Sequence, residues 1–124
     1  MDQSLKRFYD RLLGVLRDPI LRAGTWQMLE CVSAWEGNWT WDCFLAFAWQ
    51  GSDGGRWLVT VNYAPNQSQC YVRLPFAELA GSQWRFQDHM TEVAYVRDGN
   101  DLQSRGLYMD VPAWNVSAFS ITRN

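Results

Sequence analysis

The chain has 124 residues, of which 48% are hydrophobic and 19% charged, so it has the size of one domain and the composition of a globular protein. Its net charge is -2 and Lys6 is its only lysine, which excludes the basic stripe that nucleic-acid binding needs. No apolar run reaches the length of about 18 residues that spans a membrane. Eight tryptophans are the unusual feature, and they indicate an aromatic β core or a sugar-binding surface.

The N-terminal part is predicted to be an amphipathic helix over residues 4–17. Apolar side chains recur there at helical spacing, at Leu5, Phe8, Leu12, Val15 and Leu16. Pro19 ends this helix, because the residue before a proline is pushed out of the α region. A turn at residues 23–24 follows.

The pattern beyond Thr25 is that of short β-strands separated by glycine, proline and asparagine turns. We expect eight strands, near residues 25–33, 42–50, 56–64, 69–75, 84–90, 93–97, 107–111 and 115–122. The segment Asp98-Gly99-Asn100-Asp101 is predicted to be a hairpin turn and not a calcium loop, because the full EF-hand pattern is absent. With no helix recurring between strands, the sheets should be antiparallel.

Side-chain alternation predicts which faces of the strands are buried. Cys70 and Val72 share one face of their strand, whereas Gln69 and Tyr71 share the other, so this strand should have one solvated face. The strand at 42–50 is apolar on both faces. It should therefore be covered outside as well, by the N-terminal helix or by a neighbouring domain.

Several segments, taken in order, resemble the end of an α-amylase-family enzyme (glycoside hydrolase family 13). They are Phe8-Tyr9-x-x-Leu12-Leu13, Arg17-Asp18-Pro19-x-Leu21-Arg22-x-Gly24, Phe44-Leu45-Ala46-Phe47-Ala48-Trp49, Trp57-Leu58-Val59-Thr60-Val61-Asn62-Tyr63, Val72-x-Leu74-Pro75, Trp84-x-x-x-Asp88 and Val111-Pro112-x-x-x-Val116-x-x-Phe119-x-Ile121. The first two resemble the last helix of the catalytic barrel and its linker, and the others resemble the C-terminal domain. Ala113-Trp114-Asn115 departs from the glycine-containing turn of many members.

The resemblance implies two parts: residues 1–24 as the last barrel helix plus linker, and residues 25–124 as an antiparallel Greek-key β-sandwich of about eight strands. It also implies a non-catalytic accessory domain that stabilises the barrel of a parent enzyme acting on α-glucans by hydrolysis or transfer. The family's catalytic carboxylates lie on upstream barrel strands, so we expect no catalytic residue, cofactor or metal here. The alternative is a free-standing carbohydrate-binding module, which would not need the helix at 4–17.

One loop is a candidate binding site. Trp35, Trp39 and Trp41 cluster around a glycine-containing turn, and flat indole rings stack well on sugar rings. The functional interpretation is a secondary α-glucan surface. The alternative, which we expect, is packing of these rings against the barrel or across the open end of the sandwich.

The remaining reactive residues predict structural roles. His89 is the only histidine and has no metal-ligand spacing around it, and no nucleophile motif is present. Cys31, Cys43 and Cys70 lie in apolar runs, which predicts free buried thiols and favours a reducing, cytoplasmic compartment. Without its barrel the chain should expose apolar surface, so we expect a homodimer, with fold-back of residues 4–17 as the rival.

Overall fold

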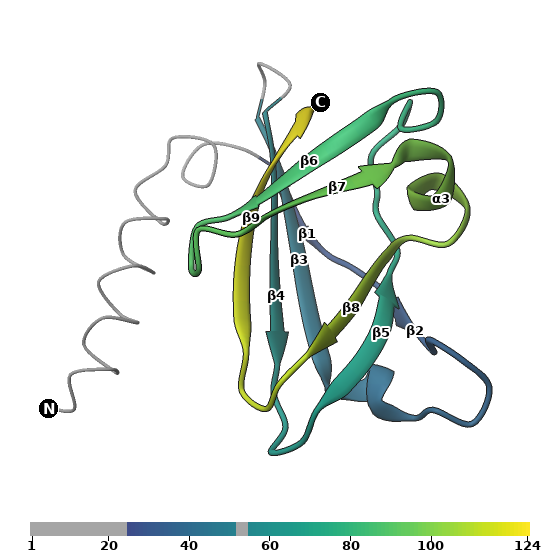
Figure 1. Cartoon of the computed structure of the whole chain (residues 1–124), viewed down its shortest axis with the longest axis vertical. Helices are drawn as coiled ribbons and strands as arrows, with labels where there is room; N and C mark the ends of the chain where they lie inside the picture. Colours follow the sequence, from purple (N-terminus) through teal and green to yellow (C-terminus); the bar gives the residue numbers. More distant parts are fainter. Residues whose placement is uncertain (1–24, 52–54) are drawn as a thin grey trace, which may run out of the picture.

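The computed structural model describes residues 25–51 and 55–124, which form two antiparallel sheets (Figure 1). One has six strands in the order β1-β3-β4-β9-β6-β7, and the other has three in the order β2-β5-β8. The strands are β1 (Thr25–Met28), β2 (Cys31–Val32), β3 (Phe44–Gln50), β4 (Arg56–Asn62), β5 (Ser68–Val72), β6 (Gln83–Asp88), β7 (Ala94–Asp98), β8 (Leu107–Val111) and β9 (Val116–Arg123). The mainly β, antiparallel prediction is confirmed, and the helix predicted at 4–17 lies outside the described residues.

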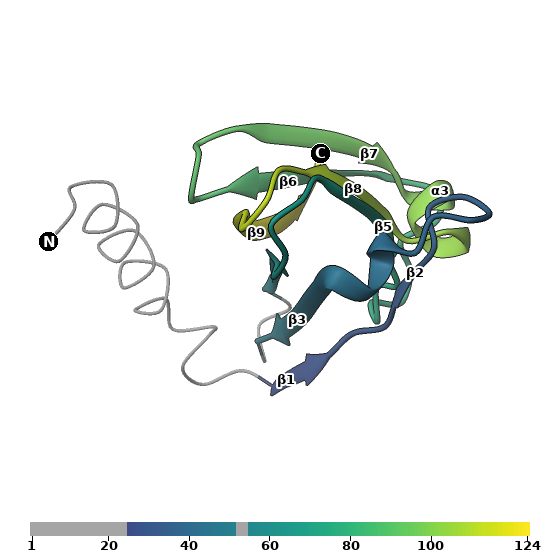
Figure 2. The ribbon, with the colours of Figure 1, turned by 90° about the horizontal axis from the view of Figure 1, so that it is seen from below.

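The core lies between the two sheets, which face each other as two layers (Figure 2). The larger sheet contributes Phe44, Leu58, Phe86 and Phe119, and the smaller contributes Cys70, Val72, Leu107 and Met109. The alternation predicted for β5 is confirmed, because Cys70 and Val72 are buried while Gln69 and Tyr71 are only half-buried.

The single strand expected at 25–33 is wrong. Its first half, β1, pairs with β3 in the larger sheet, and its second half, β2, pairs with β5 in the smaller sheet. Leu29 still donates its backbone N–H to Ala46 of β3 at 2.8 Å, whereas Glu30 already accepts from Arg73 beyond β5 at 2.9 Å. The chain therefore passes from one sheet to the other between these two residues.

The hairpin turn expected at Asp98–Asp101 is also wrong, because these residues begin a short helix, α3 (Gly99–Ser104). The Asp98 carboxylate accepts the backbone N–H of Asn100 and caps the helix start. Leu102 is buried in the core, which holds the helix between the two sheets. Gly106 ends it in the left-handed region, with a φ of 98°.

The C-terminal end of β4 is fixed by a buried amide. Asn62 has no exposed surface, and its Nδ2 donates to the carbonyls of Asn66 at 2.9 Å and Pro112 at 3.0 Å. One side chain thus holds together the β4–β5 and β8–β9 connections. This is the asparagine of the Val-Asn pair in the family-like strand motif.

Replacement of Gly106 by alanine should destabilise the fold more than replacement of another left-handed glycine. A Cβ at Gly106 would lie 2.2 Å from the backbone oxygen of Val72, whereas one at Gly81, with a φ of 86°, meets nothing within 4 Å. Gly81→Ala should cost about 1–2 kcal/mol of unfolding free energy from backbone strain alone. Gly106→Ala should cost at least about 1 kcal/mol more, because β5 must shift. Urea denaturation measures both, and equal losses would contradict the close packing of Gly106 on β5.

Candidate functional site

The tryptophan loop (residues 33–41) is compact because its own polar groups close it. The Ser33 hydroxyl donates to the carbonyls of Trp35 and Asn38, and the Asn38 N–H donates to the Trp35 carbonyl at 3.1 Å. Gly37 takes a φ of 84° in this turn, which favours glycine. The loop runs into a short 3-10 helix, η1 (Thr40–Cys43).

The same loop is hydrogen-bonded to β5, the central strand of the smaller sheet. Asn38 donates from Nδ2 to Oε1 of Gln69 at 2.9 Å, and its Oδ1 accepts from both the N–H and the hydroxyl of Thr40. The Gln69 N–H in turn donates to the Thr40 hydroxyl at 2.9 Å. These bonds hold the backbone of the loop at a fixed place beside the smaller sheet.

The three predicted indoles lie outside the core. Trp35 is 53% exposed, Trp39 66% and Trp41 39%. Trp41 lines a hollow of about 230 Å³ together with Met28, Phe44 and Leu45, so it stands toward the larger sheet. The rings are therefore available both to a sugar and to a neighbouring domain, and each interpretation stays a prediction.

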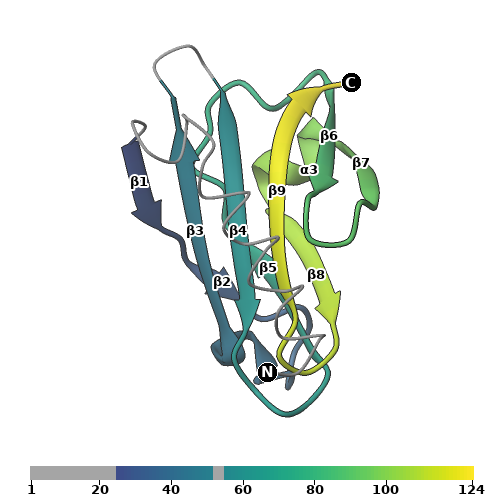
Figure 3. The same ribbon diagram turned by 90° about the vertical axis from the view of Figure 1, so that its left-hand side faces the viewer.

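A second feature is an apolar outer face on the larger sheet, formed by β1, β3, β4 and β9 (Figure 3). The strand register aligns its side chains in three rows across the strands. The rows are Trp26, Trp49 and Trp57; Met28, Phe47, Val59 and Ala118; and Leu45, Val61 and Val116. The strand expected at 42–50 is β3, and its outward Leu45 is exposed, so the outer cover expected for this strand is incomplete among the described residues and stays a prediction.

This apolar outer face is covered unevenly. At its β9 side Trp57 is buried, with the His89 ring 4.7 Å from its own, and it packs with Met90 and Ala118. At its β1 side Trp26 is 59% exposed and Met28 63%. Soluble monomers rarely leave large contiguous apolar patches in water, so this side has the character of an interface.

Asp88 and His89, near the apolar outer face, make hydrogen bonds within the larger sheet. Asp88 is buried, and its Oδ1 accepts the N–H groups of Met90 at 2.9 Å and Ala118 at 3.2 Å, which ties β6 to β9. His89 shares a 2.8 Å hydrogen bond with the Ser120 hydroxyl. Within residues 25–51 and 55–124, no three histidine, cysteine or acidic groups come together as metal ligands.

The cysteines are free, as predicted, and two of the three are buried. The structure brings Cys31 of β2 and Cys70 of β5 into side-chain hydrogen-bond contact, a proximity that their distant sequence positions gave no sign of. Donation to Cys31, together with burial, raises the pKa of the Cys70 thiol far above its usual value. The same hydrogen bond lowers the pKa of the Cys31 thiol, and both sulfurs pack in the core.

Comparison with known proteins adds no assignment. No protein-family model matches the chain, and a search of curated proteins gives no match. In the part of the chain that the structure describes, no helix has the length and apolar character to cross a membrane.

The exposure of Trp39 predicts a small effect of its removal on stability. Trp39→Ala should change the unfolding free energy by no more than about 0.5 kcal/mol, as expected for an exposed site. Trp84→Ala is the matched contrast, because that indole is buried, and its loss should cost about 3–5 kcal/mol. Thermal denaturation compares the two. A large loss from Trp39→Ala would show that its ring packs within this chain.

Proposed function

We propose that this chain is the C-terminal accessory domain of an α-amylase-like glycoside hydrolase acting on α-glucans, without catalytic residues of its own. In this proposal the two sheets are the Greek-key sandwich of such enzymes, and residues 4–17 are the last helix of the preceding barrel. Its role is to cover an apolar part of the barrel and stabilise it. The three free cysteines favour a reducing compartment, so we place the parent enzyme in the cytoplasm.

The position of the family-like segments supports the proposal. Three of these segments are Phe44–Trp49, Trp57–Tyr63 and the part of the closing segment from Val116 to Ile121. They correspond to β3, β4 and β9, which are direct neighbours in the larger sheet. These three segments therefore lie side by side, and their outward side chains form most of the apolar outer face.

That apolar outer face is the observation that carries the proposal. Its exposed side lies along β1, the strand with which the described residues begin, so the preceding chain enters at this edge. Residues 18–24 reach at most about 25 Å when extended. The predicted helix at 4–17 would be about 21 Å long, and the four strands of the face span roughly 15 Å. The apolar stripe of the predicted helix therefore has a length that matches the width of the apolar outer face. In the parent enzyme this helix would be part of the barrel, so the barrel is the expected partner of the face.

A free-standing carbohydrate-binding module is the second candidate. The exposed indoles of Trp35 and Trp39 favour it, because a module of that kind needs flat rings in water. It gives no reason for the apolar outer face, which such a module would leave in contact with solvent unless residues 4–17 or a second copy covered it. The two candidates differ in what surrounds these residues in the native polypeptide.

The native polypeptide should settle the assignment. We expect it to exceed 14.4 kDa by a barrel of about 250 residues or more and to release reducing sugar from soluble starch. The 124-residue chain by itself should release none from starch, maltooligosaccharides or pullulan, because glycoside hydrolysis needs a placed pair of carboxyl groups. Intact mass and a reducing-sugar assay test both. A native polypeptide of 14.4 kDa, or turnover by the isolated chain that one acidic substitution abolishes, would refute the proposal.

The isolated chain should self-associate through the apolar outer face. Each large apolar side chain that becomes buried contributes about 1.5–3 kcal/mol, and several together can offset the entropy of association. Sedimentation equilibrium over roughly a hundredfold concentration range should show a dimer. Phe47→Glu should shift it to monomer, and Tyr108→Glu, which alters an exposed ring on the smaller sheet, should not.

The rival to this dimer is fold-back of the N-terminal segment over its own sheet. A monomer at every concentration, with residues 4–17 protected from limited proteolysis, would show that the segment covers the face and that the dimer is wrong. In that case Phe47→Glu should expose residues 4–17 to the protease without changing the molecular mass.

A further inference from the structure

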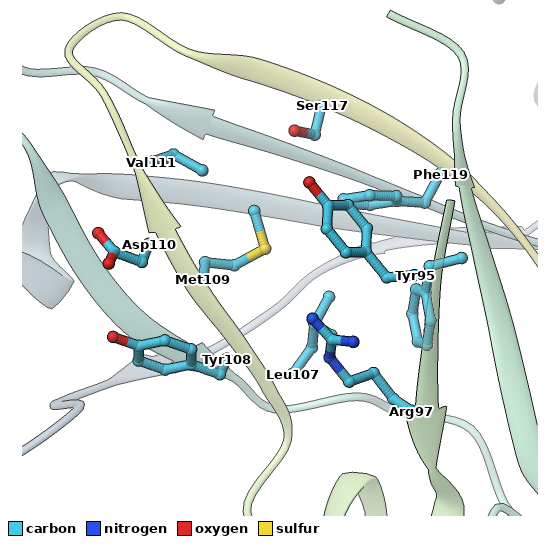
Figure 4. A pocket seen from close by; sticks show the side chains of 10 residues that line it. Tyr95, Arg97, Leu107, Tyr108, Met109, Asp110, Val111, Ser117 and Phe119 are labelled. Carbon is cyan, nitrogen blue, oxygen red and sulfur yellow. The ribbon is translucent and has the colours of Figure 1, made fainter. Parts of the chain in front are cut away.

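Figure 1 shows β7, the last strand of the larger sheet, on the same side of the molecule as β8, the last strand of the smaller sheet. A groove runs between these two strands (Figure 4). It consists of two adjoining hollows of about 200 and 120 Å³ that share Arg97 and Tyr108 in their walls. We name it the β7–β8 groove. It is separate from both the tryptophan loop and the apolar outer face.

The floor of the larger hollow is the core itself, and its rim is aromatic. Met109 and Phe119 form part of the floor, and both are buried. Tyr95 stands above them and is 40% exposed (Figure 4). Its ring is edge-on to Phe119 at 6.2 Å, and the Arg97 guanidinium lies over the same ring, 5.1 Å from its centroid. These contacts hold the ring in place and leave much of its surface to a ligand.

Tyr108 stands between the two hollows. It is 39% exposed, and its ring lies 5.4 Å from that of Tyr71 on the neighbouring strand. Partial burial, and then the nearby Asp110 carboxylate, raise the pKa of the Tyr108 hydroxyl above its usual value. The hydroxyl therefore stays protonated and able to donate at any physiological pH.

The Asp110 carboxylate on the same rim is held by two amides. Gln67 and Gln69 both donate to its Oδ1, at 2.8 and 3.0 Å. These bonds lower the pKa of Asp110, so it is ionised, and they leave Oδ2 able to accept from a ligand. A carboxylate fixed in this way loses little conformational entropy on binding.

The charges around the groove are mixed. Arg97 and Arg105 stand among Asp98, Asp101 and Asp110. An anion would meet the carboxylates and a cation would meet the guanidinium groups, so neither is favoured along the whole length. A neutral polyhydroxylated ligand satisfies both, because each hydroxyl donates to a carboxylate and accepts from an arginine.

We propose that the β7–β8 groove binds a neutral oligosaccharide. The tyrosine rings would lie against the apolar faces of the sugar rings, and the carboxylates and guanidinium groups would bind the sugar hydroxyls. The proposal concerns only a binding site and holds whether or not the chain belongs to a barrel enzyme. An extended peptide paired with the free edge of β7 or β8 is the rival occupant.

Titration calorimetry with maltohexaose, cellohexaose and xylohexaose tests the proposal on the 124-residue chain. At least one of these should bind saturably with a Kd of about 10 mM or tighter. Tyr108→Ala should weaken that binding at least roughly tenfold, and Tyr108→Phe, which keeps the ring, should bind within about threefold of the unaltered chain. Melting temperatures of the variants show whether each remains folded.

Two matched controls locate the site. Tyr63→Ala removes another exposed tyrosine, which packs against Trp114 and does not line the groove, and it should leave the Kd unchanged. Trp39→Ala should also leave it unchanged, because the tryptophan loop is not part of the groove. Saturable binding to none of the three sugars, binding that survives Tyr108→Ala, or loss of binding only in Trp39→Ala would each overturn the proposal. The proposal would also be overturned if an unstructured hexapeptide bound in the groove and none of the three sugars did.

Discussion

The larger sheet has to bury two faces, and most of the molecule follows from that requirement. Its inner face closes the core against the smaller sheet through Phe44, Leu58 and Phe119. Its outer face carries a second set of apolar side chains in the same strands, one residue out of phase. Because side chains alternate along a strand, a register shift of one residue would only exchange the two faces. One apolar set would still point away from the smaller sheet. The smaller sheet covers the first set, whereas the second set stays partly exposed among the described residues.

The sequence predicted the strands well wherever the local pattern and the tertiary environment agree. In β5, alternation alone separated buried Cys70 from the outward Tyr71. It failed between Met28 and Cys31, where the chain changes sheets without glycine or proline to mark the passage, and apolar residues continue on both sides. It failed again at Asp98, because the same aspartate and glycine that suit a turn also cap a helix. There the deciding contact is the burial of Leu102, which is a tertiary effect.

The candidate sites differ in how visible they are in the sequence. The tryptophan loop could be found because its three indoles lie within seven residues of one another. The β7–β8 groove could not, because Tyr95, Arg97 and Tyr108 belong to two strands that are not paired with each other. All residues of β7 are exposed, so its tyrosine and arginine look like ordinary surface residues until β8 is placed opposite. The contact between Cys31 and Cys70 was hidden in the same way.

The strand order determines whether the proposed surfaces can act together. The apolar outer face covers β1, β3, β4 and β9, and the groove begins at β7, with β6 between them. A barrel seated on the outer face would therefore leave the groove open to solvent. The tryptophan loop is anchored to β5 by Asn38 and Thr40, and β5 pairs with β8 through Gln69 and Asp110. The loop and the groove thus share one sheet, linked by the amide of Gln69 that holds Asp110. A sugar chain bound in the groove would lie away from the apolar outer face, so that docking there and binding in the groove need not compete. The tryptophan loop, by contrast, adjoins the apolar outer face, because Trp41 lines one hollow with Met28 and Leu45.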